Sequence, residues 1–222
     1  MNRSPFRTKA EKMDAFSHVD IYPVISSEFT SGRDVLDVLR RVGEAGAKIV
    51  QLREKNKTKA EVYRLALEYR KISAQFNMLL ILNDHLDIAL AVDADGVHLG
   101  QEDLPLEPAK KLGSSLIIGN STHNLEEAFA AQAAGADYIN IGPIYPTGTK
   151  AVACGAIGLE TMKTISAQVR LPFTVMGGIK ARHIPELISC GAAKIAMVTE
   201  ITQADDIRAR VTELRSLFLP PF

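Results

Sequence analysis

The chain has 222 residues, of which 46% are hydrophobic and 23% are charged, a composition typical of a globular protein with a large buried core. Its 26 basic residues balance its 26 acidic residues, so the net charge gives no electrostatic reason to expect binding to nucleic acid or to an anionic membrane. Cys154 and Cys190 are the only cysteines, which excludes a disulfide framework and a zinc-ligand spacing.

The sequence contains no apolar run that approaches the ~20 residues needed to span a bilayer. The segment 1–18 is polar and lacks the apolar centre of a signal peptide, so we expect a cytoplasmic enzyme. We also expect residues 1–18 to form a poorly ordered extension and residues 19–222 to form one catalytic domain.

Short apolar runs alternate with helical patterns from residue 19 onward. Most runs are continuous, which is typical of parallel strands that are covered on both faces. The expected strands span residues 21–25, 48–52, 79–82, 96–99, 116–119, 138–142, 173–176 and 194–198. The clearest helical patterns span residues 34–44, 59–76, 125–134 and 206–218.

A weak internal repeat supports one βα unit used several times. Three similar segments place a glycine (Gly46, Gly135 or Gly191) between the end of a helical pattern and the next strand. Glycine suits the left-handed conformation that commonly ends a helix. Eight strands with seven or eight helices predict the α/β class and a single (β/α)₈ TIM barrel. The alternative is a doubly wound open sheet, but no glycine-rich fingerprint follows the first strand.

In such a barrel the reactive residues follow the carboxyl ends of the strands. Arg53 and Lys55 come after the second strand and point the same way, so both can reach one phosphate, although a solvated charged loop would look the same. Asp84 and Asp103 follow the third and fourth strands and together suit a Mg²⁺ site. Alone, Asp84 would also suit a helix cap and Asp103 a turn.

The residues after the sixth, seventh and eighth strands, together with those already described, form two anion-binding regions, which we call poles. The loop after the sixth strand carries two hydroxyls, a flexible glycine and Lys150, and with the cations and the two aspartates it suits a diphosphate. Gly177 and Gly178 after the seventh strand, with Thr199 after the eighth, form a neutral pole whose backbone N–H groups suit a monophosphate. These poles predict an enzyme that joins a diphosphate substrate to a monophosphate substrate.

Several ordered motifs stand at these positions. They are Gln51-Leu52-Arg53-Glu54-Lys55, Asn83-Asp84, Gly100-Gln101-Glu102-Asp103, Ser121-Thr122-His123, Gly142-Pro143-Ile144-Tyr145-Pro146-Thr147-Gly148-Thr149-Lys150 and Gly177-Gly178-Ile179. On these motifs the chain resembles the thiamine-phosphate synthase family from about residue 19 to residue 218. One departure follows Lys150, where the family often has charged residues and this chain reads Ala151-Val152-Ala153-Cys154-Gly155-Ala156.

The resemblance implies a transferase with Mg²⁺ as cofactor and two small-molecule substrates. These are 4-amino-2-methyl-5-(diphosphooxymethyl)pyrimidine and 4-methyl-5-(2-phosphooxyethyl)thiazole, and the products are thiamine phosphate and diphosphate. Diphosphate departs first in this family, and the thiazole nitrogen captures the resulting pyrimidine methyl cation. No nucleic acid or membrane partner is expected, and the sequence leaves open whether the chain forms a homo-oligomer.

The resemblance also implies a role for individual residues. The pyrimidine diphosphate would be held by Gln51, Leu52, Arg53, Glu54, Lys55, Asn83, Ser121 and Lys150. Mg²⁺ would be bound by Asp84 and Asp103. The thiazole phosphate would be held by Thr147, Gly148, Thr149, Gly178, Val198 and Thr199. The catalytic residues among them would be Arg53, Lys55, Ser121 and Lys150.

Two other functions compete with this prediction. A thiazole tautomerase would share the barrel and His123, but that branch lacks the aspartate pair and the Thr-x-Thr-Lys run that this chain has at 147–150. A non-catalytic sensor of phosphate ligands would have no need of Mg²⁺ beside a leaving group. The intact set of cations and carboxylates therefore favours the synthase.

Overall fold

Eight parallel strands close into one barrel in a computed structural model that describes residues 3–149 and 155–218. The strands are β1 (Ile21–Ile25), β2 (Ile49–Leu52), β3 (Leu79–Asn83), β4 (Gly96–Leu99), β5 (Ile117–Thr122), β6 (Tyr138–Ile141), β7 (Phe173–Val175) and β8 (Ile195–Met197). Their order around the barrel follows the sequence, and β1 pairs with β8, so that Ile21 lies opposite Ile195. The prediction of a TIM barrel is therefore confirmed.

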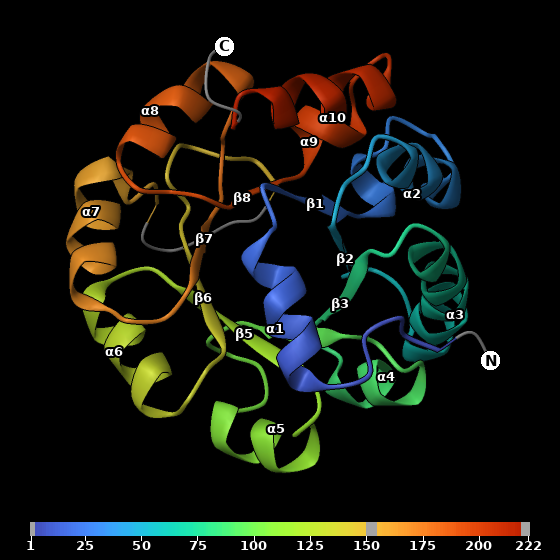
Figure 1. Ribbon diagram of the computed structural model, residues 1–222, viewed down its shortest axis with the longest axis horizontal. Coiled ribbons are helices and arrows are strands. Elements are labelled where there is room, and N and C mark those ends of the chain that lie inside the picture. Colours follow the sequence, from blue (N-terminus) through green and yellow to red (C-terminus); the bar gives the residue numbers. More distant parts are fainter. Residues whose placement is uncertain (1–2, 150–154, 219–222) are drawn as a thin grey trace.

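Helices form a ring outside the strands (Figure 1). They are α2 (Val35–Glu44), α3 (Lys59–Gln75), α4 (Leu86–Ala91), α5 (Leu106–Leu112), α6 (Leu125–Ala133), α7 (Gly158–Gln168), α8 (Ile184–Ser189), α9 (Thr199–Thr202) and α10 (Ile207–Ser216). Short 3₁₀ turns stand at η1 (Ser27–Phe29) and η2 (Ala181–His183). Gly46, Gly135 and Gly191 have φ values of 80°, 77° and 91°, as the repeat predicted.

The core has two parts because successive side chains on each strand point to opposite faces. The larger part lies between the strands and the outer helices and includes Val50, Leu52 and Leu80. The smaller part fills the inside of the barrel and includes Ile49, Leu79 and Tyr138. Over residues 3–149 and 155–218, no helix has the length and apolar character required to cross a membrane.

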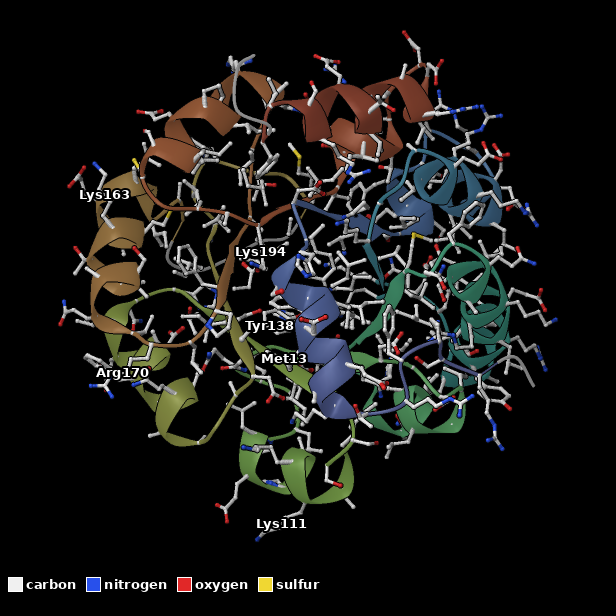
Figure 2. The ribbon with its side chains drawn as sticks, in the orientation of Figure 1. Met13, Lys111, Tyr138, Lys163, Arg170 and Lys194 are labelled. Atoms are coloured by element: carbon white, nitrogen blue, oxygen red, sulfur yellow. The ribbon has the colours of Figure 1, made fainter. Side chains whose placement is uncertain are left out.

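The N-terminal segment differs from the expected poorly ordered extension. Residues Lys9–Ser17 form helix α1, which begins with a capping box between Thr8 and Glu11. This helix lies across the barrel (blue in Figure 1), and its Phe16 is buried against Tyr138 with ring centroids 4.6 Å apart. Figure 2 shows Tyr138 beside this helix. Burial of an aromatic side chain offsets the entropy of ordering the segment.

Charged contacts fix which end of the barrel α1 covers. Lys9 pairs with Asp137 at 2.7 Å, and Lys12 donates to the carbonyl oxygen of Ser115 at 3.0 Å. Ser115 and Asp137 precede β5 and β6, so α1 closes the amino end of the barrel. The opposite end, at the carboxyl ends of the strands, stays open for the site described next.

Candidate active site

A cavity of about 440 Å³ lies at the carboxyl ends of the strands. Its walls include most of the residues that the sequence predicted, from β2 round to β8. These residues are Gln51, Arg53, Lys55, Asn83, Asp84, Asp103, Ser121, Thr147, Gly148, Thr149, Gly178, Val198 and Thr199. Lys150 lies outside the described residues.

Leu52 and Glu54 are exceptions, since neither is in the cavity wall. Leu52 packs in the core between the barrel and the helices, because it alternates with the inward-facing Gln51. Glu54 is buried and accepts hydrogen bonds from the N–H and the hydroxyl of Ser27, at 2.8 and 2.7 Å. The assignment of these two side chains to the substrate therefore does not fit; Glu54 instead anchors the turn η1, whose Phe29 lines the cavity.

Asp84 and Asp103 meet on one wall of the cavity. Burial raises the pKa of Asp84, the ammonium of Lys55 that contacts it lowers that pKa, and the nearby carboxylate of Asp103 raises it. The N–H of Gly100 donates to Asp103 Oδ2 at 2.6 Å. Asp84 has φ of 62°, a strained conformation for a residue other than glycine, and such strain is concentrated at functional sites.

A chain of hydrogen bonds runs from this mouth into the barrel. Ser121 Oγ lies 3.0 Å from His98 Nε2, and His98 Nδ1 lies 3.0 Å from the hydroxyl of Tyr138. That hydroxyl lies 3.3 Å from the hydroxyl of Tyr22, which accepts from Gln51 Nε2 at 3.0 Å. Burial raises the pKa of both tyrosines, which keeps them neutral. Two cavity residues, Gln51 and Ser121, are thus oriented through the barrel interior.

The glycine pair after β7 packs against the loop after β6. Gly178 has φ of 63°, and a Cβ added there would lie 2.3 Å from the carbonyl oxygen of Pro146. The N–H of Tyr145 donates to the carbonyl oxygen of Gly177 at 3.0 Å. The hydroxyls of Thr147 and Thr149 lie 2.9 Å apart in the same loop. Glycine is required here because two backbone segments approach closely.

The cavity also contains polar residues that the sequence reasoning missed. They are His98, Asn140, Lys180, Glu200 and Gln203. His98 and Asn140 stand within β4 and β6, on strands that read as apolar runs. A polar residue at an inward position of such a strand is the signal that identifies them. Asn124, which follows β5, has a structural role, because its side chain accepts from the N–H of Glu127 at 2.9 Å and caps α6.

A polar cavity at the carboxyl mouth of a (β/α)₈ barrel, with cations and paired carboxylates in its wall, defines a TIM-barrel enzyme that acts on small molecules. The model of one family, described as thiamine monophosphate synthase, matches residues 21–201. The chain belongs to this family.

Individual relatives agree with the family model. The chain is 46% identical over 200 residues to a thiamine-phosphate synthase of Dictyoglomus thermophilum, with 90% of each chain covered. It is 44% identical over 199 residues to one of Pelotomaculum thermopropionicum, with 89% of this chain and 91% of the relative covered. Among solved structures, a thiamine phosphate pyrophosphorylase from Pyrococcus furiosus superposes on the chain with a TM-score of 0.83 and 34% sequence identity. The match covers 90% of this chain and 95% of the Pyrococcus furiosus chain.

Proposed function

We propose that the cavity joins a pyrimidine methyl diphosphate to a thiazole phosphate with release of diphosphate, the transferase reaction of its family (EC 2.5.1.3). The observation that carries this proposal is the division of the cavity wall. The two cations and the aspartate pair that follow β2, β3 and β4 stand on one side, and the glycine pair with Thr199 stands on the other, where Lys180 and Glu200 add charged side chains. One cavity therefore offers separate places to a diphosphate and a monophosphate.

Residues on the cationic side hold the pyrimidine diphosphate. Arg53 and Lys55 supply fixed positive charge for its oxygens. Gln51 and Ser121, held by the hydrogen-bond chain, offer polar atoms to the pyrimidine ring. Asn83 stands at the end of β3 beside them, and Lys150 is assigned to the same diphosphate from the sequence alone.

Mg²⁺ fits the aspartate pair. The carboxylate of Asp103 is close enough to that of Asp84 to raise the pKa of Asp84. Two neighbouring carboxylates repel each other, and a cation between them would relieve this repulsion. The ammonium of Lys55 contacts Asp84, so the carboxylate already has a positively charged partner in the cavity wall, which supports a cation site there. Oxygen ligands from one or two carboxylates, completed by substrate phosphate, are the set that Mg²⁺ prefers. When bound, the ion would supply positive charge beside the leaving diphosphate.

Residues on the opposite side hold the thiazole phosphate. Thr147, Gly148 and Thr149 come from the loop after β6, and Gly178 lies against that loop. Val198 and Thr199 follow β8 and complete the wall. Backbone N–H groups and hydroxyls are suited to a monophosphate, and loops seven and eight are the recurrent phosphate site of this fold.

The proposed reaction requires stabilisation of the departing diphosphate and correct positioning of the two substrates. The bond between the pyrimidine methylene carbon and the diphosphate oxygen breaks, and its electron pair leaves with the diphosphate. Arg53, Lys55 and Lys150 stabilise the negative charge that develops there. The lone pair of the thiazole nitrogen then forms the new carbon–nitrogen bond, so no general base is required. Holding both substrates in one cavity replaces a bimolecular encounter.

Both substrates are multiply charged phosphates that do not cross a membrane unaided, so we place the reaction in the cytoplasm. The test is to mix the two substrates with the protein and to measure diphosphate and thiamine phosphate together. Equimolar release of both is expected. A tautomerase would release no diphosphate, and a sensor would bind the phosphates without turnover; either result would contradict the proposal.

A further inference from the structure

Lys180 is a cationic side chain at the pole that the sequence predicted to be neutral. It follows the glycine pair directly after Ile179, and it lines the cavity together with Gly178 and Thr199. Its Nζ lies 3.1 Å from Glu200 Oε2, and its side chain is 43% exposed. Lys180 therefore stands beside the proposed place of the thiazole phosphate.

Glu200 holds this lysine at the cavity. Its Oε1 accepts a hydrogen bond from the N–H of Ala181 at 3.1 Å and faces Arg210 Nη1 at 4.0 Å. Only 13% of the Glu200 side chain is exposed, so the carboxylate is fixed while the lysine reaches over it on a flexible stem. Arg210 pairs more closely with Glu213, at 2.9 Å, than with Glu200, so Lys180 is the main cationic partner of Glu200 and the cation of this cluster that lines the cavity.

We propose that Lys180 contacts the monophosphate of the thiazole substrate and determines the preference of the enzyme for the phosphorylated thiazole over the corresponding alcohol. This inference rests on the proposed placement of the thiazole phosphate beside Gly178 and Thr199. Lys180 carries three N–H donors and so can keep its contact with Glu200 while it donates to a phosphate oxygen. Hydrogen bonds between ionised groups are among the strong ones, and a thiazole without phosphate cannot form this contact.

Replacement of Lys180 by alanine tests the inference. The KM for the thiazole phosphate should rise about tenfold, the loss of one charge-assisted hydrogen bond. The KM for the pyrimidine diphosphate should stay within about twofold of the wild-type value, and so should kcat at saturation. The preference for thiazole phosphate over thiazole alcohol should fall by the same factor of about ten, because the alcohol never used the contact.

Lys163→Ala is the matched control. Lys163 pairs with Glu160 at 2.8 Å and is also part-exposed, but Figure 2 places it at the outer edge of α7. The Lys163→Ala variant should leave the KM for the thiazole phosphate, the KM for the pyrimidine diphosphate and kcat unchanged. Lys180→Arg should restore most of the preference for phosphate, because it keeps the charge.

A variant that removes the negative charge of Glu200 should change the KM for the thiazole phosphate in the opposite direction. Glu200→Gln keeps an acceptor for the N–H of Ala181 and removes the negative charge, so it should lower the KM for the thiazole phosphate about twofold. The inference is overturned if Lys180→Ala leaves the preference for thiazole phosphate over thiazole alcohol unchanged. That result includes the case in which the two thiazoles both bind normally and the case in which their KM values rise by the same factor. Wild-type turnover separates this from the proposed function, since a wild-type protein without diphosphate release would contradict the function itself.

Discussion

Gly178 lies at φ of 63°, and an added Cβ would lie 2.3 Å from the carbonyl oxygen of Pro146 and 2.9 Å from Tyr145 Cβ. Contacts of a Cβ below 3.0 Å essentially never occur, so the loop after β6 must withdraw by roughly 0.7 Å in Gly178→Ala. The same loop carries the hydroxyls of Thr147 and Thr149. A displacement of about 1 Å in a positioning element costs about a hundredfold in rate, and we expect a loss of that order in kcat/KM for the thiazole phosphate.

Gly191→Ala separates this clash from the backbone penalty. Gly191 also has a left-handed φ, 91°, but nothing lies within 4 Å of a Cβ built there. Both variants therefore pay about 1–2 kcal/mol for an L-residue in this conformation, and both melting temperatures should fall by a few degrees. Initial rates of diphosphate release should separate them, with Gly191→Ala close to wild type. Equal kcat/KM values in the two variants would refute the reasoning.

Three further substitutions test single roles. Asp84→Asn keeps a side chain that tolerates a left-handed φ but removes a proposed metal ligand, so kcat should fall by about a hundredfold with little change in melting temperature; a folding defect without a rate defect would favour a purely structural role. Lys150→Ala should lower kcat by about a hundredfold with a smaller change in the KM for the pyrimidine substrate, and a wild-type rate would mean that the lysine is only solvated. Tyr138→Phe keeps the ring packed on Phe16 but removes the hydroxyl beside His98, so kcat should fall about tenfold; a normal kcat with a lower melting temperature would assign the hydrogen-bond chain to stability alone.

The strands were predictable because both of their faces are buried. A continuous apolar run such as Ile21–Ile25 reads directly as a parallel strand, and the observed bounds are identical there and at Gly96–Leu99, where His98 is the one polar residue. Other boundaries shift by one to three residues, as at β5, which continues through Ser121 to Thr122. Polar residues at the carboxyl end of a strand belong to the site as well as to the sheet, and an apolar pattern does not include them.

The site was predictable only in part, because strand geometry decides which neighbours face the cavity. The run from Gln51 to Lys55 reads as one motif, yet Leu52 and Glu54 face away from the cavity. Alternation along β2 accounts for this result. Helix α1 was missed although Thr8 and Glu11 have the spacing of a capping box, since its stability depends on Phe16 packing inside a distant barrel.

The most direct test of the account is the Mg²⁺ dependence of diphosphate release. Enzyme freed of divalent ions with a chelator is mixed with both substrates, and diphosphate and thiamine phosphate are measured before and after Mg²⁺ is added. If Asp84 and Asp103 bind Mg²⁺, diphosphate release should be negligible without the ion. Addition of Mg²⁺ should restore equimolar formation of both products. Product formation at an equal rate in the presence and absence of Mg²⁺ would contradict the account.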